Sequence, residues 1–325
     1  MLDKISFQIM LELCQDGRIS NASLAQKLGK SEHTIAKRIN AMIADDVIAI
    51  KALPNPAKMG YQASAFIGLK VDLKKIDKVC AQLMDDIHIN LVVTCFGRFD
   101  VLVIVYFREW AMLQNFIKNE LPGIDGINHI ETYLVSEAKK RNKGVFSNTG
   151  GNVEPVVLDE TNQHLIQELI KNGRPSYTDL ADKLGISVST ISRRISTLIK
   201  NDMIEILAIP NPSKLGYLAS AFIMLRIELA KAAQIIEHLS SYPEVHTVMR
   251  LMNDYDILFG VDAADAEALY DFIKSKIANI EGILSTETFV SGHFLYFSGE
   301  ALIMPSLNAQ SINFPHSSII NHEKK

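Results

Sequence analysis

The chain carries an internal repeat that spans most of its length. Residues 52–56 read Ala-Leu-Pro-Asn-Pro, and residues 208–212 read Ala-Ile-Pro-Asn-Pro. Residues 63–67 return unchanged at 219–223, so both matches have the same offset of 156 residues (208 − 52 and 219 − 63). Because the offset stays constant over long stretches, the chain is a tandem duplication, and its fold must be built from two similar halves.

The composition is that of an ordinary globular protein. A length of 325 residues, with 48% hydrophobic and 22% charged residues, allows several cores. No apolar run approaches the roughly 18 residues that span a bilayer, and the amino terminus does not resemble a signal peptide, so we expect a cytoplasmic protein without membrane contacts. The widely spaced Cys14, Cys80 and Cys95 predict buried thiols, and neither disulfides nor a zinc site. The net charge of −4 leaves room for a local basic surface.

The amino-terminal third of each half has the spacing of a helix-turn-helix. Apolar residues at one-face spacing predict a first helix, and Ser20 and Ser176 are placed as N-caps of a second, short helix. The second helix ends at Gly29 or Gly185, and a Leu-Gly-X-Ser link restarts a third helix. Two short helices joined by a tight turn that contains glycine are typical of a helix-turn-helix. Short β-branched runs that predict a wing strand and a proline hinge follow at 48–53 and 204–209.

The third helix of each half has a polar face opposite its isoleucines. A solvated amphipathic helix is one interpretation, but the helix-turn-helix spacing, found twice, favours contacts with double-stranded DNA in its major groove. The predicted DNA-binding residues are Ser31, His33, Thr34, Lys37, Arg38 and Asn40 in the first copy, and Ser187, Ser189, Thr190, Arg193, Arg194 and Ser196 in the second. The two faces differ at three of these positions, so we hypothesise an operator that is not a perfect palindrome.

The remaining two thirds of each half predict a small sheet domain. Apolar runs and helical segments alternate as βαββαβ, with strands at 65–71, 91–96, 101–106 and 127–135 and helices at 76–84 and 110–121 in the first copy. The second copy repeats this order, ending in a strand at 283–290. The fold class is therefore α+β: two copies of a winged helix-turn-helix joined to a ferredoxin-like sensor domain. Because such a sheet leaves one apolar face uncovered, we expect the two sensor domains to pair within the chain as an internal pseudo-dimer.

Polar, Gly- and Asn-rich stretches separate these units. We predict winged helix-turn-helix domains at 1–53 and 158–209, sensor domains at 61–138 and 217–296, a linker at 139–157 and a tail at 297–325.

These residues together resemble the Lrp/AsnC family of feast/famine regulators, twice over nearly the whole chain. The resemblance rests on Leu-Asp before the first helix, Gly-Arg-X-Ser before the second, the Ser-to-Arg segments of the third, and the Phe99-Asp100 and Tyr255-Asp256 turns. It implies a DNA-binding winged helix joined to an amino-acid-sensing domain, and assembly into dimers and larger homo-oligomers. The implied function is transcription regulation by a small metabolite, commonly an amino acid.

The resemblance also implies an effector site at the turn between the second and third strands of each sensor domain. The matching residues are Gly97, Arg98, Phe99 and Asp100, and in the second copy Asn253, Asp254, Tyr255 and Asp256. Asn253 departs from the pattern because it replaces the glycine, and the two turn aspartates could instead hold the hairpin. Asp46 and Asp202 replace a glycine that the family usually has after the recognition helix, and we expect them to adopt the left-handed conformation.

Two other functions stay open. The architecture is also similar to that of siroheme decarboxylases, whose tetrapyrrole chemistry would call for a basic, His-bearing cavity, whereas His88, His129, His238 and His246 are scattered. A sensor or co-regulator that lacks DNA affinity is the third possibility. No nucleophile with its base and no metal-ligand spacing can be identified, so we predict no catalytic residue, no metal and no cofactor.

Overall fold

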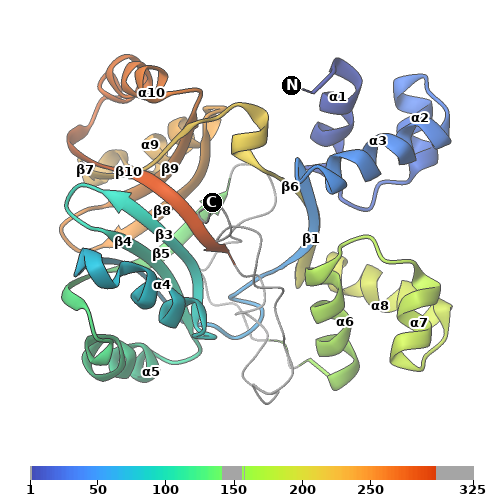
Figure 1. Ribbon diagram of the computed structural model, residues 1–325, viewed down its shortest axis with the longest axis horizontal. Coiled ribbons are helices and arrows are strands. Elements are labelled where there is room, and N and C mark those ends of the chain that lie inside the picture. Colours follow the sequence, from blue (N-terminus) through green and yellow to red (C-terminus); the bar gives the residue numbers. More distant parts are fainter. Residues whose placement is uncertain (1, 141–155, 157, 298–325) are drawn as a thin grey trace, which may run out of the picture.

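The computed structural model describes residues 2–140, 156 and 158–297. Two helical domains lie on one side of the molecule and a β-barrel flanked by helices lies on the other, with two paired strands between them (Figure 1). The predicted linker and tail fall largely outside the described residues, although the strand before the linker continues through Lys140. No helix in the described part of the chain is both long enough and apolar enough to cross a membrane.

Each helical domain has the three helices that the sequence predicts. Serine hydroxyls cap the second and third helices of both copies, and the second helices end in the left-handed Gly29 and Gly185. Asp46 and Asp202 have φ angles of 56° and 54°, which confirms the left-handed turn expected after the third helix. The helices are α1 Lys4–Leu13, α2 Asn21–Leu28 and α3 Glu32–Ala44, and α6 Glu160–Lys171, α7 Tyr177–Leu184 and α8 Val188–Lys200.

The two wing strands pair with each other. β1 (Ile48–Pro54) runs antiparallel to β6 (Ile204–Pro210), and we call this pair the wing ribbon. Lys51 lies opposite Leu207, which is its own counterpart in the repeat (207 − 51 = 156), so the ribbon has a local twofold axis at this pair. The sequence predicted both strands but not that each one is the partner of the other.

The βαββαβ order of both sensor domains is confirmed. Their elements are β2 Ala63–Val71, α4 Ile76–Met84, β3 Ile89–Phe96, β4 Val101–Phe107, α5 Trp110–Asn115 and β5 Ile127–Lys140, and β7 Ala219–Ile227, α9 Ala232–Ser241, β8 Val245–Met252, β9 Ile257–Ala263, α10 Ala266–Phe272 and β10 Ile283–Phe297. The second helix of each domain is shorter than predicted as a regular α-helix, because it widens into a π-helical turn at Phe116–Glu120 and at Ile273–Ile277.

The two sensor sheets join edge to edge into one closed barrel. Its strand order is β10-β3-β4-β2-β5-β8-β9-β7, so β5 pairs with β8 and β10 pairs with β3 of the other copy. The predicted ends of the last strands, at 135 and 290, are wrong, because these strands continue to Lys140 and Phe297. The extension at 136–140 is polar and the one at 291–297 begins with Ser and Gly, and the backbones of both pair with the other copy. This closure leaves neither sheet with a free edge.

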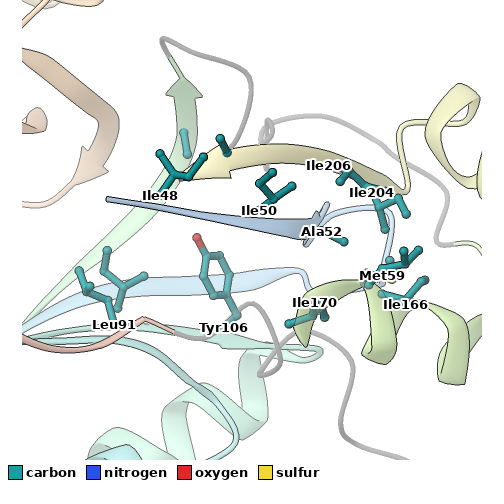
Figure 2. Close-up of a cluster of buried hydrophobic side chains, with 14 of the residues drawn as sticks. Ile48, Ile50, Ala52, Met59, Leu91, Tyr106, Ile166, Ile170, Ile204 and Ile206 are labelled. Atoms are coloured by element: carbon teal, nitrogen blue, oxygen red, sulfur yellow. The ribbon is translucent and has the colours of Figure 1, made fainter. Parts of the chain in front are cut away.

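Apolar residues alternate between the inside and the outside of the barrel. On the outside, α4 and α5 cover one copy and α9 and α10 cover the other, each over its own core. The inside contains aromatic rings from both copies, including Phe66 and Phe222 with centroids 6.1 Å apart. The same core continues through the wing ribbon into both helical domains. Figure 2 shows this junction, where barrel and helix side chains lie beside the ribbon: Leu91 and Tyr106, Ile166 and Ile170, and Ile48, Ile50, Ala52, Ile204 and Ile206.

Candidate DNA-binding surface and effector site

The start of each recognition helix, α3 or α8, is fixed by its own hydroxyl groups. The Ser31 hydroxyl accepts a hydrogen bond from the Thr34 N–H at 3.2 Å, and Ser187 accepts one from the Thr190 N–H at the same distance. The hydroxyls of each serine and threonine also lie within 2.9 Å of each other. These four predicted DNA-binding residues therefore shape the first turn of the helix.

The two arginines shared by the recognition helices turn back onto the first helix of their own domain. Arg38 donates to the Asp3 carboxylate and, at 2.8 Å, to the Ser6 hydroxyl. Arg194 donates to Asp159 at 2.7 Å and to Asn162 at 3.0 Å. The hydrogen bond from Arg38 lowers the pKa of Asp3 to about 2. Each guanidinium thus ties its recognition helix to the N-terminus of the first helix.

The exposed face of each recognition helix carries the residues that differ between the copies. In the first copy these are His33, Lys37 and Asn40, and in the second copy Ser189, Arg193 and Ser196. All six are exposed, whereas Ile35 and Ile191 on the opposite side are fully buried. The structure therefore brings together, on each helix, a polar surface of donors and acceptors suited to base edges and phosphates.

The turn between β3 and β4 is held by Asp100. Its carboxylate accepts the Val71 backbone N–H at 3.0 Å and the Lys70 ammonium at 2.9 Å. Gly97 has a φ of +123°, which favours glycine, and Phe99 is fully buried in a stack against Phe289 of the other copy. Of the four predicted effector residues in this turn, Asp100 and Phe99 thus fix the hairpin.

The turn between β8 and β9 has the same framework but different exposed groups. Asp256 accepts the Ile227 N–H at 2.8 Å, and Tyr255 is buried. Asn253, which replaces the glycine, accepts the Leu134 N–H of the first copy at 3.2 Å. Asp254 is exposed where the first copy has Arg98, so the two turns carry opposite charges.

Arg98 connects the two copies through a pair of glutamates. Its guanidinium donates to Glu131 of its own copy at 3.0 Å and to Glu287 of the second copy at 3.2 Å. Tyr133 donates to Glu131 at 2.8 Å, and Tyr255 donates to Glu287. Although burial acts in the opposite direction, the hydrogen bonds from Tyr133 and Arg98 hold the pKa of Glu131 below its usual value.

Glu131 and Glu287 are not among the residues predicted from the sequence to form a site. Glu131 and Glu287 occupy equivalent positions of the repeat, at the expected offset of 156 residues (287 − 131). A Glu-Thr pair kept at the same place in both halves was the signal that could have found them.

The scattered histidines lie in four different settings. His88 stacks on Phe107 with centroids 4.3 Å apart, and His129 lies 3.1 Å from Glu131. His238 contacts Tyr242, and His246 lies against Gly260 and 4.0 Å from Asp262. Over the described ranges, no three His, Cys, Asp or Glu side chains are placed to hold a metal ion. Burial raises the pKa of the Cys80 thiol to about 11 and that of Cys95 to about 12, as expected for enclosed thiols.

Comparison with known proteins agrees with this architecture. The Lrp/AsnC ligand binding domain matches residues 64–145 and 220–293, and a winged helix-turn-helix DNA-binding domain matches residues 2–49 and 158–205. An uncharacterized HTH-type transcriptional regulator of Pyrococcus horikoshii is 37% identical over 134 residues, which are 41% of this chain and 85% of the relative. The HTH-type transcriptional regulator FL11 of Pyrococcus furiosus is 30% identical over 135 residues, or 41% of this chain and 89% of that protein.

Fold and sites define a class of proteins in which winged helix-turn-helix domains are joined to ligand-binding sensor domains. This chain belongs to the Lrp/AsnC family, with both family domains present twice. Each of these relatives corresponds to one half of the chain, so the tandem chain contains the equivalent of two such proteins.

Solved structures include two kinds of similar protein. The siroheme decarboxylase NirDL covers 92% of this chain and 96% of its own length with a TM-score of 0.64, but at 14% identity. This likeness shows that the whole arrangement of domains is shared. E. coli AsnC is 26% identical and covers 44% of this chain and 97% of its own, with a TM-score of 0.42.

Proposed function

We propose that the chain is a sequence-specific DNA-binding regulator of transcription whose DNA affinity responds to a small metabolite. The observation that carries this proposal is the presence of two exposed, polar recognition faces related by the twofold axis of the wing ribbon. Duplex DNA offers two half-sites related by the same kind of axis. The relatives named as HTH-type transcriptional regulators support the same function.

The two halves of the operator should differ. His33, Lys37 and Asn40 would read one half-site, and Ser189, Arg193 and Ser196 the other, while the capping residues and the two shared arginines position the helices. A selection of bound sequences from a random pool tests this point. Recovery of a perfect palindrome would contradict it.

The effector is proposed to bind at the two sensor turns and to be an amino acid. Arg98, Asn253 and Asp254 are exposed there, and Gly97 leaves room beside them. Phe99, Asp100, Tyr255 and Asp256 would keep the turns in shape. A ligand carboxylate would compete with Glu131 and Glu287 for the Arg98 guanidinium. We also propose that whole chains associate further, which sedimentation with and without amino acids would test.

We propose that the chain is not an enzyme, and siroheme decarboxylation is the alternative that its fold requires us to test. NirDL has the same domain arrangement. A tetrapyrrole with many carboxylates calls for convergent cationic side chains. In the part of the chain that is described, His88, His129, His238 and His246 instead make separate contacts, which favours the regulator.

Fluorescence anisotropy with the DNA upstream of the protein's own gene tests the proposal. Salt is titrated with and without the twenty amino acids, because specific binding persists to higher salt than nonspecific binding. Specific binding that one amino acid shifts would support the full proposal. Specific binding that none shifts would refute the effector. Absence of specific binding, together with a Soret shift on adding siroheme, would favour the enzyme, and absence of both would favour a co-regulator.

A further inference from the structure

The Gly-Arg pairs at 17–18 and 173–174 lie where the two winged helices meet. They precede the second helix of each domain, and the function proposed above assigns them no role. The wing ribbon holds the domains around its twofold axis, and each Gly-Arg pair contacts the opposite copy. We call these contacts the cross-clamp.

The glycines of the cross-clamp are needed for space. The Gly17 N–H donates to the Ile206 carbonyl at 2.7 Å, and the Gly173 N–H donates to the Ile50 carbonyl at 2.7 Å. A Cβ added to Gly17 would lie 2.7 Å from that same carbonyl oxygen, and one added to Gly173 would lie 2.8 Å from the Ile206 side chain. Neither glycine has a positive φ, so close backbone approach is what requires glycine here.

The arginines make the same connection in both directions. Arg18 donates to the Gly173 carbonyl at 3.0 Å, and its guanidinium lies 4.7 Å from the centre of the Tyr177 ring. Arg174 donates to the Gly17 carbonyl at 3.2 Å and to the Ile19 carbonyl at 3.1 Å. The Arg174 guanidinium also donates to Asn21, which begins α2. Each winged helix is therefore anchored to its partner at a loop as well as along the wing ribbon.

We infer that the cross-clamp fixes the distance and rotation between the two recognition helices, so that the protein accepts two unlike half-sites at a single separation. This inference rests on the proposed DNA-binding function. Each additional base pair moves the second half-site by about 3.4 Å along the duplex and turns it by about a tenth of a helical turn. If the distance and rotation between α3 and α8 are fixed, a change in spacing moves one of the two helices out of its major groove.

The test uses the full-length protein and a series of operators. A site is first obtained by selection from a random pool, and its half-sites are then moved together or apart by one and two base pairs. For the wild-type chain we expect one optimal spacing and a loss of about tenfold or more in affinity at the changed spacings. The double variant Arg18→Ala/Arg174→Ala removes the arginine contacts but keeps the wing ribbon, so it should weaken this preference and reduce the loss at the changed spacings to about threefold.

A matched control comes from two lysines in the same domains. Lys27 pairs with Glu12 and Lys183 pairs with Glu168, each within its own winged helix. The variant Lys27→Ala/Lys183→Ala removes the same charge as the arginine variant but leaves the cross-clamp intact. It should keep the wild-type spacing profile, although its overall DNA affinity falls at low salt.

Several outcomes would overturn the inference. The inference fails if the wild type binds operators of all spacings with equal affinity. It also fails if the arginine variant keeps the wild-type preference for one spacing. Both results leave the proposed function in place. Absence of sequence-specific binding at any spacing would refute the proposed function, and this inference with it. If the double variant does not give a wild-type circular dichroism spectrum, the single variant Arg174→Ala is measured in its place, because it removes the contacts with Gly17, Ile19 and Asn21 and keeps Arg18. An unchanged spacing preference in this single variant would likewise overturn the inference.

Discussion

Replacing Asp100 with alanine tests whether this turn residue serves the hairpin or a ligand. Its carboxylate accepts the Val71 N–H and the Lys70 ammonium, and its side chain is only 17% exposed. A hydrogen bond to a charged group contributes about 1.5 to 3 kcal/mol, and Lys70 is too exposed to add more than a fraction of this. We therefore expect Asp100→Ala to lower the free energy of unfolding by about 2 kcal/mol.

The repeat supplies the matched comparisons. Asp256→Ala removes the equivalent bond to Ile227 and should cost a similar amount or slightly less, because Arg226 lies over the Tyr255 ring and adds no ion pair to this carboxylate. Asp254→Ala changes an exposed residue of the same turn and should stay within about 0.5 kcal/mol of wild type. Urea unfolding followed by far-UV circular dichroism measures all three. Unchanged stability in Asp100→Ala, combined with loss of the amino-acid effect on DNA binding, would refute the hairpin role.

Three further predictions concern packing, pH and DNA. Gly68→Ala should lower the free energy of unfolding by about 1 to 3 kcal/mol, because the new Cβ would lie 2.4 Å from the buried Phe99 ring, whereas Gly123→Ala, with open space around it, should have little effect in the same urea titration. The Asp3 pKa is lowered from 3.8 to about 2, so its stabilising effect is present above pH 3.8 and is lost as the pH falls toward 2. The melting temperature of the wild type should therefore fall more between pH 3.8 and pH 2 than that of Asp3→Asn. An equal fall in both proteins would contradict the pairing of Asp3 with Arg38. Lys37→Ala should weaken binding to the preferred operator by about 1 to 3 kcal/mol and relax the base preference in one half-site, and an unchanged base preference would exclude base reading by Lys37.

Much of the fold follows from local pattern in the sequence. Three local features are found as predicted: the serine N-caps, the glycines that end the second helices, and the left-handed conformation of Asp46. Each depends only on residues near it in the sequence. The strand extensions past 135 and 290 were not predicted, since their strand partners, β8 and β3, belong to the other copy. The wing ribbon was missed for the same reason: β1 and β6 each look like an edge strand until the second copy is considered.

The candidate sites were less predictable than the fold. The sequence grouped Arg38 and Arg194 with the DNA-facing residues, because helical periodicity places them near the polar boundary. Their contacts with the first helix depend on how three helices pack, which periodicity alone does not contain. Likewise, the bridge from Arg98 to Glu287 spans 189 residues and exists only in the closed barrel.

The two copies share residues that hold the fold and differ at residues proposed to contact DNA and ligand. Positions that are identical in both halves make contacts within the protein: Gly17 and Gly173, Arg18 and Arg174, Arg38 and Arg194, and Asp100 and Asp256. Among the positions that differ, four pairs are exposed on the recognition helices or the sensor turns: His33 and Ser189, Lys37 and Arg193, Asn40 and Ser196, and Arg98 and Asp254. A homodimer must present the same residue twice, because one gene encodes both of its halves. Fusion removes that constraint while the shared contacts keep the twofold frame, so under the proposed function each half of this chain can recognise its own half-site and its own ligand group.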